Sequence, residues 1–442
     1  MNRATLLAIL QQSEYDPVYF NRWWCNHHSD QIELQPKKWT AKLRLIDQLS
    51  RLLFWLPTHQ QILSTAWFLS PADWLIKSSI LFAAKLKLKQ LKRRGLKVVA
   101  FAGSYGKTST KKITQHVLQA QVETQATPKS INTPLGIARF ILNQLNPTTK
   151  VFLVELGEYY PGDVARLAQF AEPEYGIVCP LGRQHLERMQ HIETIAQTIM
   201  ELAGFFHFHP GKVLLHESVV PFLPTGLTTP PLTYGQLPAS DYAVSHGTVS
   251  WAGTEAKLQL TKQAEPIQAY TPLFGVHQLE NSLPALWLAQ VLGLDQAAAV
   301  RQLGNTPFVP HRHQPIFIQN NILLLDNGYN SNPDSAPQSL ALLKNLPASR
   351  RIVITPGFAE LGEESDLLHQ LFGKNLAKVV DYLGVIDSQG SESIQQGFLA
   401  AGGARDQIIT GRTQTEVSER MAPLFVPQTI VLFENNLPEV YN

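Results

Sequence analysis

The sequence has little charge, few cysteines and no long hydrophobic run. Charged residues make up 16% of its 442 positions and the formal net charge is +2, so no overall field attracts it to nucleic acid, and we expect no nucleic-acid partner. Cys25 and Cys179 are far apart and lack partners at metal-ligand spacing, which argues against a disulfide framework and favours a reducing compartment. The apolar runs are shorter than the roughly 20 residues that span a membrane, and the start of the chain has no secretory pattern. We therefore expect a cytoplasmic globular protein of about two or three domains.

The first 95 residues differ from the rest of the chain. They hold six of the eight tryptophans, and no acidic residue occurs between Asp73 and Glu123. Short apolar runs broken by prolines predict a helical segment, which a basic run at 85–94 follows. Basic residues beside tryptophans and leucines suit an anionic membrane surface, so this segment could hold the protein peripherally at the inner membrane face. The simpler alternative is an ordinary small core followed by a solvated basic linker.

The most specific motif begins where an apolar strand pattern over 98–102 meets a glycine-rich turn. The motif consists of Gly103, Ser104, Tyr105, Gly106, Lys107, Thr108 and Ser109. Glycines allow a tight turn whose N–H groups point at phosphate oxygens in front of a helix N-terminus. In such loops the lysine reaches the outer phosphates and the hydroxyl after it contacts Mg²⁺. The motif predicts a bound nucleotide, although its glycines are one residue closer together than in the common Walker pattern.

From residue 96 onward, strand and helix patterns alternate, which predicts an α/β fold with parallel sheets covered by helices. We expect a P-loop ATPase domain at 96–310 and a Rossmann-like C-terminal domain at 311–442, after the helical, Trp-rich segment at 1–95. A β-rich stretch is expected at 211–273 and a hinge at 307–315. The expected helices are 108–120, 164–171 and 277–292; the expected strands are 97–102, 151–156, 175–178, 321–326, 351–355, 379–386 and 429–433.

Two polar residues follow strands at the edge where parallel sheets bind ligands. Glu155 ends the second strand and is a natural oxygen ligand for the magnesium ion of a nucleotide, with a surface or capping glutamate as the alternative. His185 follows the third strand, where a structural histidine and a ligand-binding one are both consistent with the residues alone.

Together these segments resemble the Mur ligase family, the ATP-dependent amide ligases of peptidoglycan synthesis and their folate-polyglutamating relatives. The resemblance runs from about residue 96 to the C-terminus and includes the short glycine spacing. The segments at 326–335 and 360–362 are most similar to the branch that adds D-alanyl-D-alanine to a UDP-linked muramoyl tripeptide. The other matching segments are 131–136, 155–157, 185–187, 275–281 and 311–312.

The resemblance implies that a substrate carboxylate attacks ATP to give an acyl phosphate, which an amine converts to an amide. It implies ATP and Mg²⁺ as cofactors, a UDP-linked muramoyl peptide and D-Ala-D-Ala as substrates, and a monomer. Lys107, Glu155 and His185 would be catalytic, with Thr108 and Glu155 on one Mg²⁺ and His185 on a second. Asn281 would contact adenine, Arg312 the phosphates, and Asp326, Tyr329 and Asn330 the ribose and base.

Two departures from the family pattern keep alternatives open. Many members carry a carbamylated lysine that supports the second Mg²⁺, and the matching position here is Ile199; Glu201, Glu187 or water would have to substitute, or the second site is weak. The UDP-binding N-terminal domain of the family is also not recognisable. An amide ligase for another, membrane-proximal acyl acceptor, or a nucleotide-binding homologue without catalysis, therefore remains an alternative.

Overall fold

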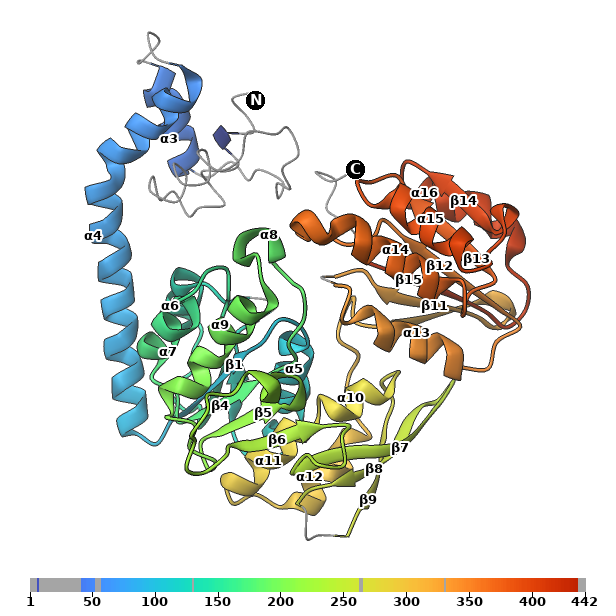
Figure 1. Ribbon diagram of the computed structural model, residues 1–442. Helices are drawn as coiled ribbons and strands as arrows, with labels where there is room; N and C mark the ends of the chain where they lie inside the picture. Colours follow the sequence, from blue (N-terminus) through green and yellow to red (C-terminus); the bar gives the residue numbers. More distant parts are fainter. Residues whose placement is uncertain are drawn as a thin grey trace. The chain divides into compact units, whose positions relative to one another are not determined.

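The computed structural model describes residues 6–7, 41–51, 57–128, 131–261, 265–329 and 331–435. The chain divides into two compact units, Met1–Ala83 with Leu437–Asn442, and Ala84–Asn436 (Figure 1). The first unit contains α3 (Ala41–Ser50) and the beginning of α4 (Thr58–Arg93), so the described part of this segment is helical, as expected. Trp23, Trp24, Trp39, Trp55 and Cys25 lie outside the described residues. In the part of the chain that is described, no helix is long and apolar enough to cross a membrane.

The first sheet of the larger unit has nine strands in the order β2-β3-β1-β4-β5-β6-β7-β8-β9. All neighbours from β2 to β7 are parallel, and β7, β8 and β9 are antiparallel. The β-rich stretch expected at 211–273 is therefore an extension of the same sheet. The strands are β1 (Lys97–Ala102), β2 (Thr124–Ala126), β3 (Val151–Glu155), β4 (Tyr175–Val178), β5 (Val213–His216), β6 (Leu232–Gly235), β7 (Tyr242–Ser250), β8 (Gly253–Gln259) and β9 (Ile267–Thr271).

Helices cover both faces of this sheet because successive strand residues point to opposite sides. Val99 and Phe101 enter a core shared with α5 and α11, in which Trp287 is fully buried. On the other face, Phe152 stacks on Phe140 of α6 with ring centroids 5.7 Å apart. The helices are α5 (Lys107–Gln119), α6 (Pro134–Asn143), α7 (Asp163–Ala171), α8 (Leu186–Met189), α9 (Ile192–Phe205), α10 (Val276–Glu280), α11 (Leu283–Val291) and α12 (Gln296–Leu303), with a 3₁₀ helix, η2 (Glu217–Phe222).

The single helix expected at 277–292 is in fact two helices. α10 ends at Glu280, and α11 begins at Leu283 with Pro284 in its first turn. A proline has no backbone N–H to donate to the preceding turn, so the hydrogen-bond ladder cannot run through this position.

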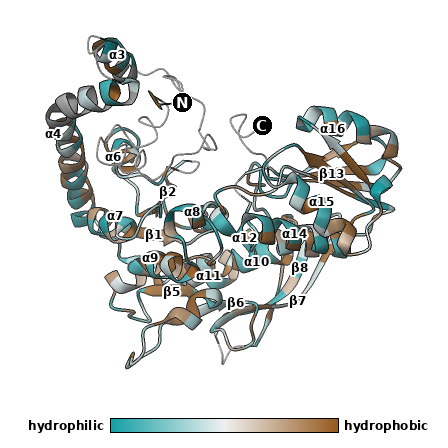
Figure 2. Cartoon of the chain, turned by 45° about the horizontal axis from the view of Figure 1, so that its top comes forward, coloured by the Kyte–Doolittle hydropathy of each residue, from teal (hydrophilic) through white to brown (hydrophobic). Residues whose placement is uncertain are grey.

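The second sheet has six strands in the order β10-β11-β15-β12-β13-β14, and within it only β10 is antiparallel to its neighbour. One of its cores joins Ile352, Ile354 and Val431 to Val417 and Met421 of α16. In Figure 2, β13 is coloured mostly as hydrophobic, whereas α16 is largely hydrophilic. The elements are β10 (Gln314–Ile318), β11 (Ile322–Asn327), β12 (Arg350–Thr355), β13 (Tyr382–Ile386), β14 (Ile408–Gly411), β15 (Thr429–Glu434), α13 (Ala336–Asn345), α14 (Ser365–Leu376), α15 (Ser391–Ala400) and α16 (Gln414–Met421), with short 3₁₀ helices η3 (Gln319–Asn321), η4 (Gly362–Glu364), η5 (Arg405–Gln407) and η6 (Ala422–Leu424).

The expected α/β class with parallel sheets is confirmed, and a second local correction concerns the hinge. Part of the hinge expected at 307–315 belongs to β10, which begins at Gln314. Pro315 is compatible with this strand because β10 lies at the edge of the sheet, where a missing N–H does not interrupt the ladder. The bounds expected for the three domains stay a prediction.

Candidate active site

The glycine-rich loop lies between β1 and α5, as predicted. Gly103 and Gly106 have φ angles of 143° and 77°, a region that residues with a Cβ rarely adopt. A Cβ on Gly103 would also lie 2.6 Å from Cβ of Cys179. Glycine at this position thus allows the loop to pass close to the end of β4. Helix α5 begins directly after the loop, at Lys107.

Lys107 points back into the loop and is buried. Its Nζ donates to the carbonyl oxygens of Gly103 and Ser104 and pairs with the Oε1 atom of Glu158. Glu158 follows β3, is 3% exposed, and its Oε2 atom finds no hydrogen-bond partner among the described residues. Burial raises the pKa of Glu158, and the nearby charges of Lys107 and His185 oppose that rise. Glu158 was not predicted as a site residue, although it stands three residues after Glu155.

Thr108 and Glu155 meet, as the two predicted ligands of one Mg²⁺ should. The Thr108 hydroxyl donates to Oε2 of Glu155 at 3.0 Å, and Nζ of Lys111 lies 3.0 Å from the same oxygen. Burial lowers the pKa of Lys111, while Glu155 opposes that shift. Lys111 was missed, although a lysine four residues after Lys107 lies on the same face of a helix.

The hydroxyl and carboxylate oxygens at this point are the hard donors that Mg²⁺ prefers, so the residues fit the ion. The described ranges contain no group of three His, Cys, Asp or Glu side chains that could hold a metal on its own. Mg²⁺ commonly binds through one or two carboxylates, phosphate oxygens and water, and such a site needs no protein cage.

His185 has a φ angle of 60° and contacts a carboxylate from the second sheet's half of the molecule. Its Nδ1 hydrogen-bonds to Oε2 of Glu360, and Nη2 of Arg188 donates to Oε1 of Glu360 at 3.2 Å. Burial alone would raise the pKa of Glu360, but His185 and Arg188 outweigh it and lower the value to about 2. The structure therefore holds His185 on Glu360.

The other predicted nucleotide contacts fall into two groups. Asn281 lies against the loop: its Oδ1 accepts a hydrogen bond from Thr110 at 3.2 Å, and a Cβ on Gly106 would lie 3.3 Å from that oxygen. Arg312 covers the ring of Tyr329 at 4.9 Å, and Asp326 accepts from His311 Nδ1 at 2.7 Å. Asn330 lies outside the described residues.

Three further loop residues line the turn itself. Ser104 and Ser109 are buried and Tyr105 is half-buried. Within the described ranges the Ser104 hydroxyl has no hydrogen-bond partner, and the Tyr105 ring lies 2.9 Å from where a Cβ on Gly182 would stand. The turn is thus packed against the loop that follows β4.

The segment after β11 reaches the loop after β4 through an ion pair. Asp334 accepts from the backbone N–H of Arg183 at 2.6 Å and from its guanidinium at 2.7 Å. Asp334 and Glu360 were noted only as parts of matching segments, and their contacts with Arg183 and His185 were not predicted.

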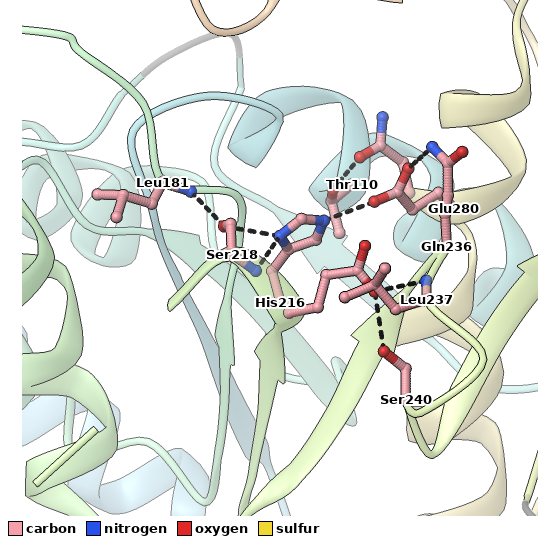
Figure 3. Close-up of polar contacts among 10 residues, drawn as sticks. Thr110, Leu181, His216, Ser218, Gln236, Leu237, Ser240 and Glu280 are labelled. Atoms are coloured by element: carbon pink, nitrogen blue, oxygen red, sulfur yellow. Dashed lines mark hydrogen bonds and ion pairs between the residues drawn. The ribbon is translucent and has the colours of Figure 1, made fainter. Parts of the chain in front are cut away.

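A buried polar network lies at the ends of β5 and β6 and includes Glu280, the residue before Asn281 in the sequence (Figure 3). His216 Nε2 is 2.5 Å from Oε1 of Glu280, and Gln236 donates to Oε2 of Glu280 at 2.6 Å. Burial would raise the pKa of Glu280, but the hydrogen bond and charge of His216 lower it. Ser218 contacts the other His216 nitrogen and accepts the N–H of Leu181 at 2.9 Å. The network links the loop after β4 to α10, which ends at Glu280. The acidic residue before Asn281 was its one signal in the sequence.

Comparisons with known proteins support the resemblance. Residues 101–289 match the Mur ligase middle domain. The chain is 29% identical over 286 residues to the UDP-N-acetylmuramoyl-tripeptide–D-alanyl-D-alanine ligase of Escherichia coli, covering 63% of this chain and 61% of that protein. It is 30% identical over 311 residues to the protein of the same name from Synechocystis, covering 68% and 64%. The chain thus spans less than two thirds of the length of these relatives.

Solved structures share the fold over a larger part of the chain. MurF from Acinetobacter baumannii superposes with a TM-score of 0.71 at 20% identity, covering 82% of this chain and 78% of that one. MurF from Thermotoga maritima, solved in complex with ADP, gives a TM-score of 0.70 at 22% identity, covering 82% and 81%. The resemblance expected from the loop, strand-end and linker motifs is confirmed.

Proposed function

Since this chain carries the middle domain of the Mur ligase family, we propose that it is an ATP-dependent ligase that forms an amide bond through an acyl phosphate. A substrate carboxylate attacks the γ-phosphoryl group and releases ADP; an amine then attacks the acyl carbon and phosphate leaves. The observation that carries the proposal is the phosphate loop with Lys107, beside the Thr108–Glu155 pair, at the carboxyl ends of adjacent parallel strands.

The proposed substrates are those in the names of the relatives, a UDP-N-acetylmuramoyl tripeptide and D-alanyl-D-alanine. The tripeptide would supply the carboxylate and the dipeptide the amine. We propose a monomer as the active form, as expected from the sequence.

The residues have distinct tasks in this proposal. A carboxylate must approach a polyanion, so neutralising charge is the main catalytic requirement. Lys107 and the loop N–H groups would hold the phosphates, and Thr108 with Glu155 would hold Mg²⁺, which neutralises charge between the phosphates when bound. His185 is the candidate ligand of a second Mg²⁺, for which it would have to leave Glu360.

The second sheet's half would complete the nucleotide site. Asn281 would contact adenine from the central part, Arg312 the phosphates, and Asp326, Tyr329 and Asn330 the ribose and base. The Arg183–Asp334 and His185–Glu360 contacts support an arrangement in which this half covers the loop. Such cover would exclude water, which otherwise hydrolyses an acyl phosphate.

Membrane attachment through residues 1–95 is a secondary proposal, which the exposure of Trp74 and Phe82 supports, each at 66%. Part of the basic run is already engaged: Lys85 pairs with Glu172 and Lys92 with Glu174, each at 3.0 Å. These pairs reduce the positive charge left for an anionic surface.

The test is phosphate release from ATP and Mg²⁺ with each substrate alone and with both. Release that requires both the UDP-muramoyl tripeptide and D-Ala-D-Ala, and that is lost in Lys107→Met, supports the proposal. Release with a different acyl and amine pair would favour a ligase for another acceptor. Nucleotide binding without turnover under every pairing would favour a homologue that has lost catalysis.

A further inference from the structure

Among the described residues at the loop, Glu158 is a carboxylate that is buried with one of its two oxygens unpartnered. Its Oε1 atom pairs with Lys107, whereas Oε2 has no partner in the described part of the chain, and the side chain is 3% exposed. Glu155 differs, because its Oε2 binds both Thr108 and Lys111. A buried carboxylate oxygen without a partner is costly, so an additional ligand at this oxygen would be stabilising.

Glu158 also competes with the nucleotide for the same lysine. Lys107 is the residue that reaches the outer phosphates in a loop of this kind, yet here its Nζ is held by Glu158 and by the loop carbonyls of Gly103 and Ser104. Nζ has three N–H donors and three acceptors already face them, so an incoming phosphate group has to displace one acceptor, and the carboxylate is the one whose charge repels it. The carboxylate and the phosphate then lie close together, and two negative charges in a buried site repel each other unless a cation lies between them.

We propose that Glu158 changes partners when the nucleotide binds: it holds Lys107 in the empty loop and becomes a ligand of the divalent cation that accompanies ATP. This inference rests on the proposed function, because it assumes that the loop binds ATP. The cation needs no further protein cage, since phosphate oxygens and water supply the remaining ligands of Mg²⁺.

The other candidates for an additional carboxylate at this site are less suitable. Glu201 accepts the backbone N–H groups of Gly162 at 2.6 Å and Ala165 at 2.9 Å, so it serves the N-terminus of α7. Glu187 is exposed, and Ile199 is fully buried and has no ligand atom. Glu158 lies next to Tyr159, whose ring is 5.1 Å from that of His185.

The experiment measures how strongly Mg²⁺ and ATP promote each other's binding. The ATP dissociation constant of the full chain is determined by calorimetry with Mg²⁺ and with EDTA, for the wild type, Glu158→Gln and the matched control Glu201→Gln. In the wild type and the control, Mg²⁺ should tighten ATP binding by about 5- to 150-fold, the usual range for coupled ligands. In Glu158→Gln, ATP without Mg²⁺ should bind more tightly than to the wild type, and the gain from Mg²⁺ should fall by about tenfold.

Other results separate the alternatives. If Glu158→Gln tightens ATP binding equally with and without Mg²⁺, Glu158 only blocks the loop and the inference is wrong. An unchanged affinity under both conditions would overturn it as well. Glu158→Ala should reproduce the loss of coupling, and a thermal melt of each variant shows that it is folded. If the wild type binds no ATP at all, the proposed function itself fails, whereas normal binding with intact coupling in Glu158→Gln refutes this inference alone.

Discussion

Lys107 and Lys111 lie one turn apart on α5, and each faces a buried carboxylate, Glu158 and Glu155 respectively. The positive charges of the phosphate loop are therefore balanced before any nucleotide arrives. A buried ion pair costs desolvation free energy for both partners, so its presence says more about positioning than about stability.

Replacing Lys111 should show how much the buried Glu155 carboxylate depends on its charged partner. Lys111→Met leaves the Glu155 carboxylate buried and uncompensated, and we expect the free energy of unfolding to fall by about 3–5 kcal/mol. The measurement is urea unfolding followed by circular dichroism. Adding Glu155→Gln to that variant should recover much of the loss; equal stability of the single and double variants would contradict the pairing.

Residues close together in the sequence were the ones that could be predicted. Lys107, Thr108 and Glu155 follow from local spacing and from the rule that strand ends of a parallel sheet lie side by side. The partner of His185 could not be predicted, because Glu360 is 175 positions away and a spacing rule says nothing about such a pair. Glu158 was missed because its importance comes from burial, which the sequence around it does not reveal.

At the scale of elements, the first turn of α7 depends on a side chain from α9. The first N–H groups of a helix have no partner within the helix, and here Gly162 and Ala165 donate theirs to the carboxylate of Glu201. The negative charge also lies at the positive end of the helix dipole. One glutamate thus joins two helices on the same face of the first sheet.

Substituting this carboxylate should loosen α7. We expect Glu201→Ala to lower the free energy of unfolding by about 0.5–2 kcal/mol, the range for loss of a helix cap, and Glu201→Gln to cost less because its amide oxygen can still accept. Hydrogen exchange of the Gly162 and Ala165 amides should speed up in the alanine variant. Unchanged exchange at these two amides would contradict the assigned role.

The alternation of strands and helices was predictable because hydrophobic period and glycine turns are local signals. The break between α10 and α11 was not recognised, although Pro284 marks it. The first two residues of β10, Gln314 and Pro315, were placed in the expected hinge. The position of β10 at the edge of the sheet makes a proline acceptable in this strand.

At the scale of the whole molecule, several contacts between described residues join the two sheet-containing halves. They include the Arg183–Asp334 ion pair, the His185–Glu360–Arg188 cluster and the Trp251 indole, which donates to the carbonyl of Pro347 at 2.8 Å. The first two lie on residues that follow β4, beside the phosphate loop. The contacts between the halves and the proposed cover of the site therefore involve the same segment.

The Glu360 contact should make stability depend on pH in the acid range. The pKa of this carboxyl falls from 4.5 to about 2 on folding, so its contribution is fully present above pH 4.5 and is lost as the pH drops toward 2. Above pH 4.5, we expect Glu360→Gln to be less stable than the wild type by about 1.5–3 kcal/mol. Below that pH the difference should shrink by about 1.4 kcal/mol per pH unit.

Urea unfolding of both proteins between pH 7 and pH 3 checks this expectation. A difference that stays constant down to pH 3 would show that Glu360 is not held as a charged partner of His185 and Arg188.

The two sheets also follow one another without interleaving. Every strand of the first sheet lies between Lys97 and Thr271, and every strand of the second lies between Gln314 and Glu434. During synthesis on the ribosome, the sheet that carries the phosphate loop is complete before the first strand of the other sheet has been made, so it can form while translation continues. Asp334 and Glu360 then emerge onto an already formed surface, and the later half assembles on the earlier one as on a template.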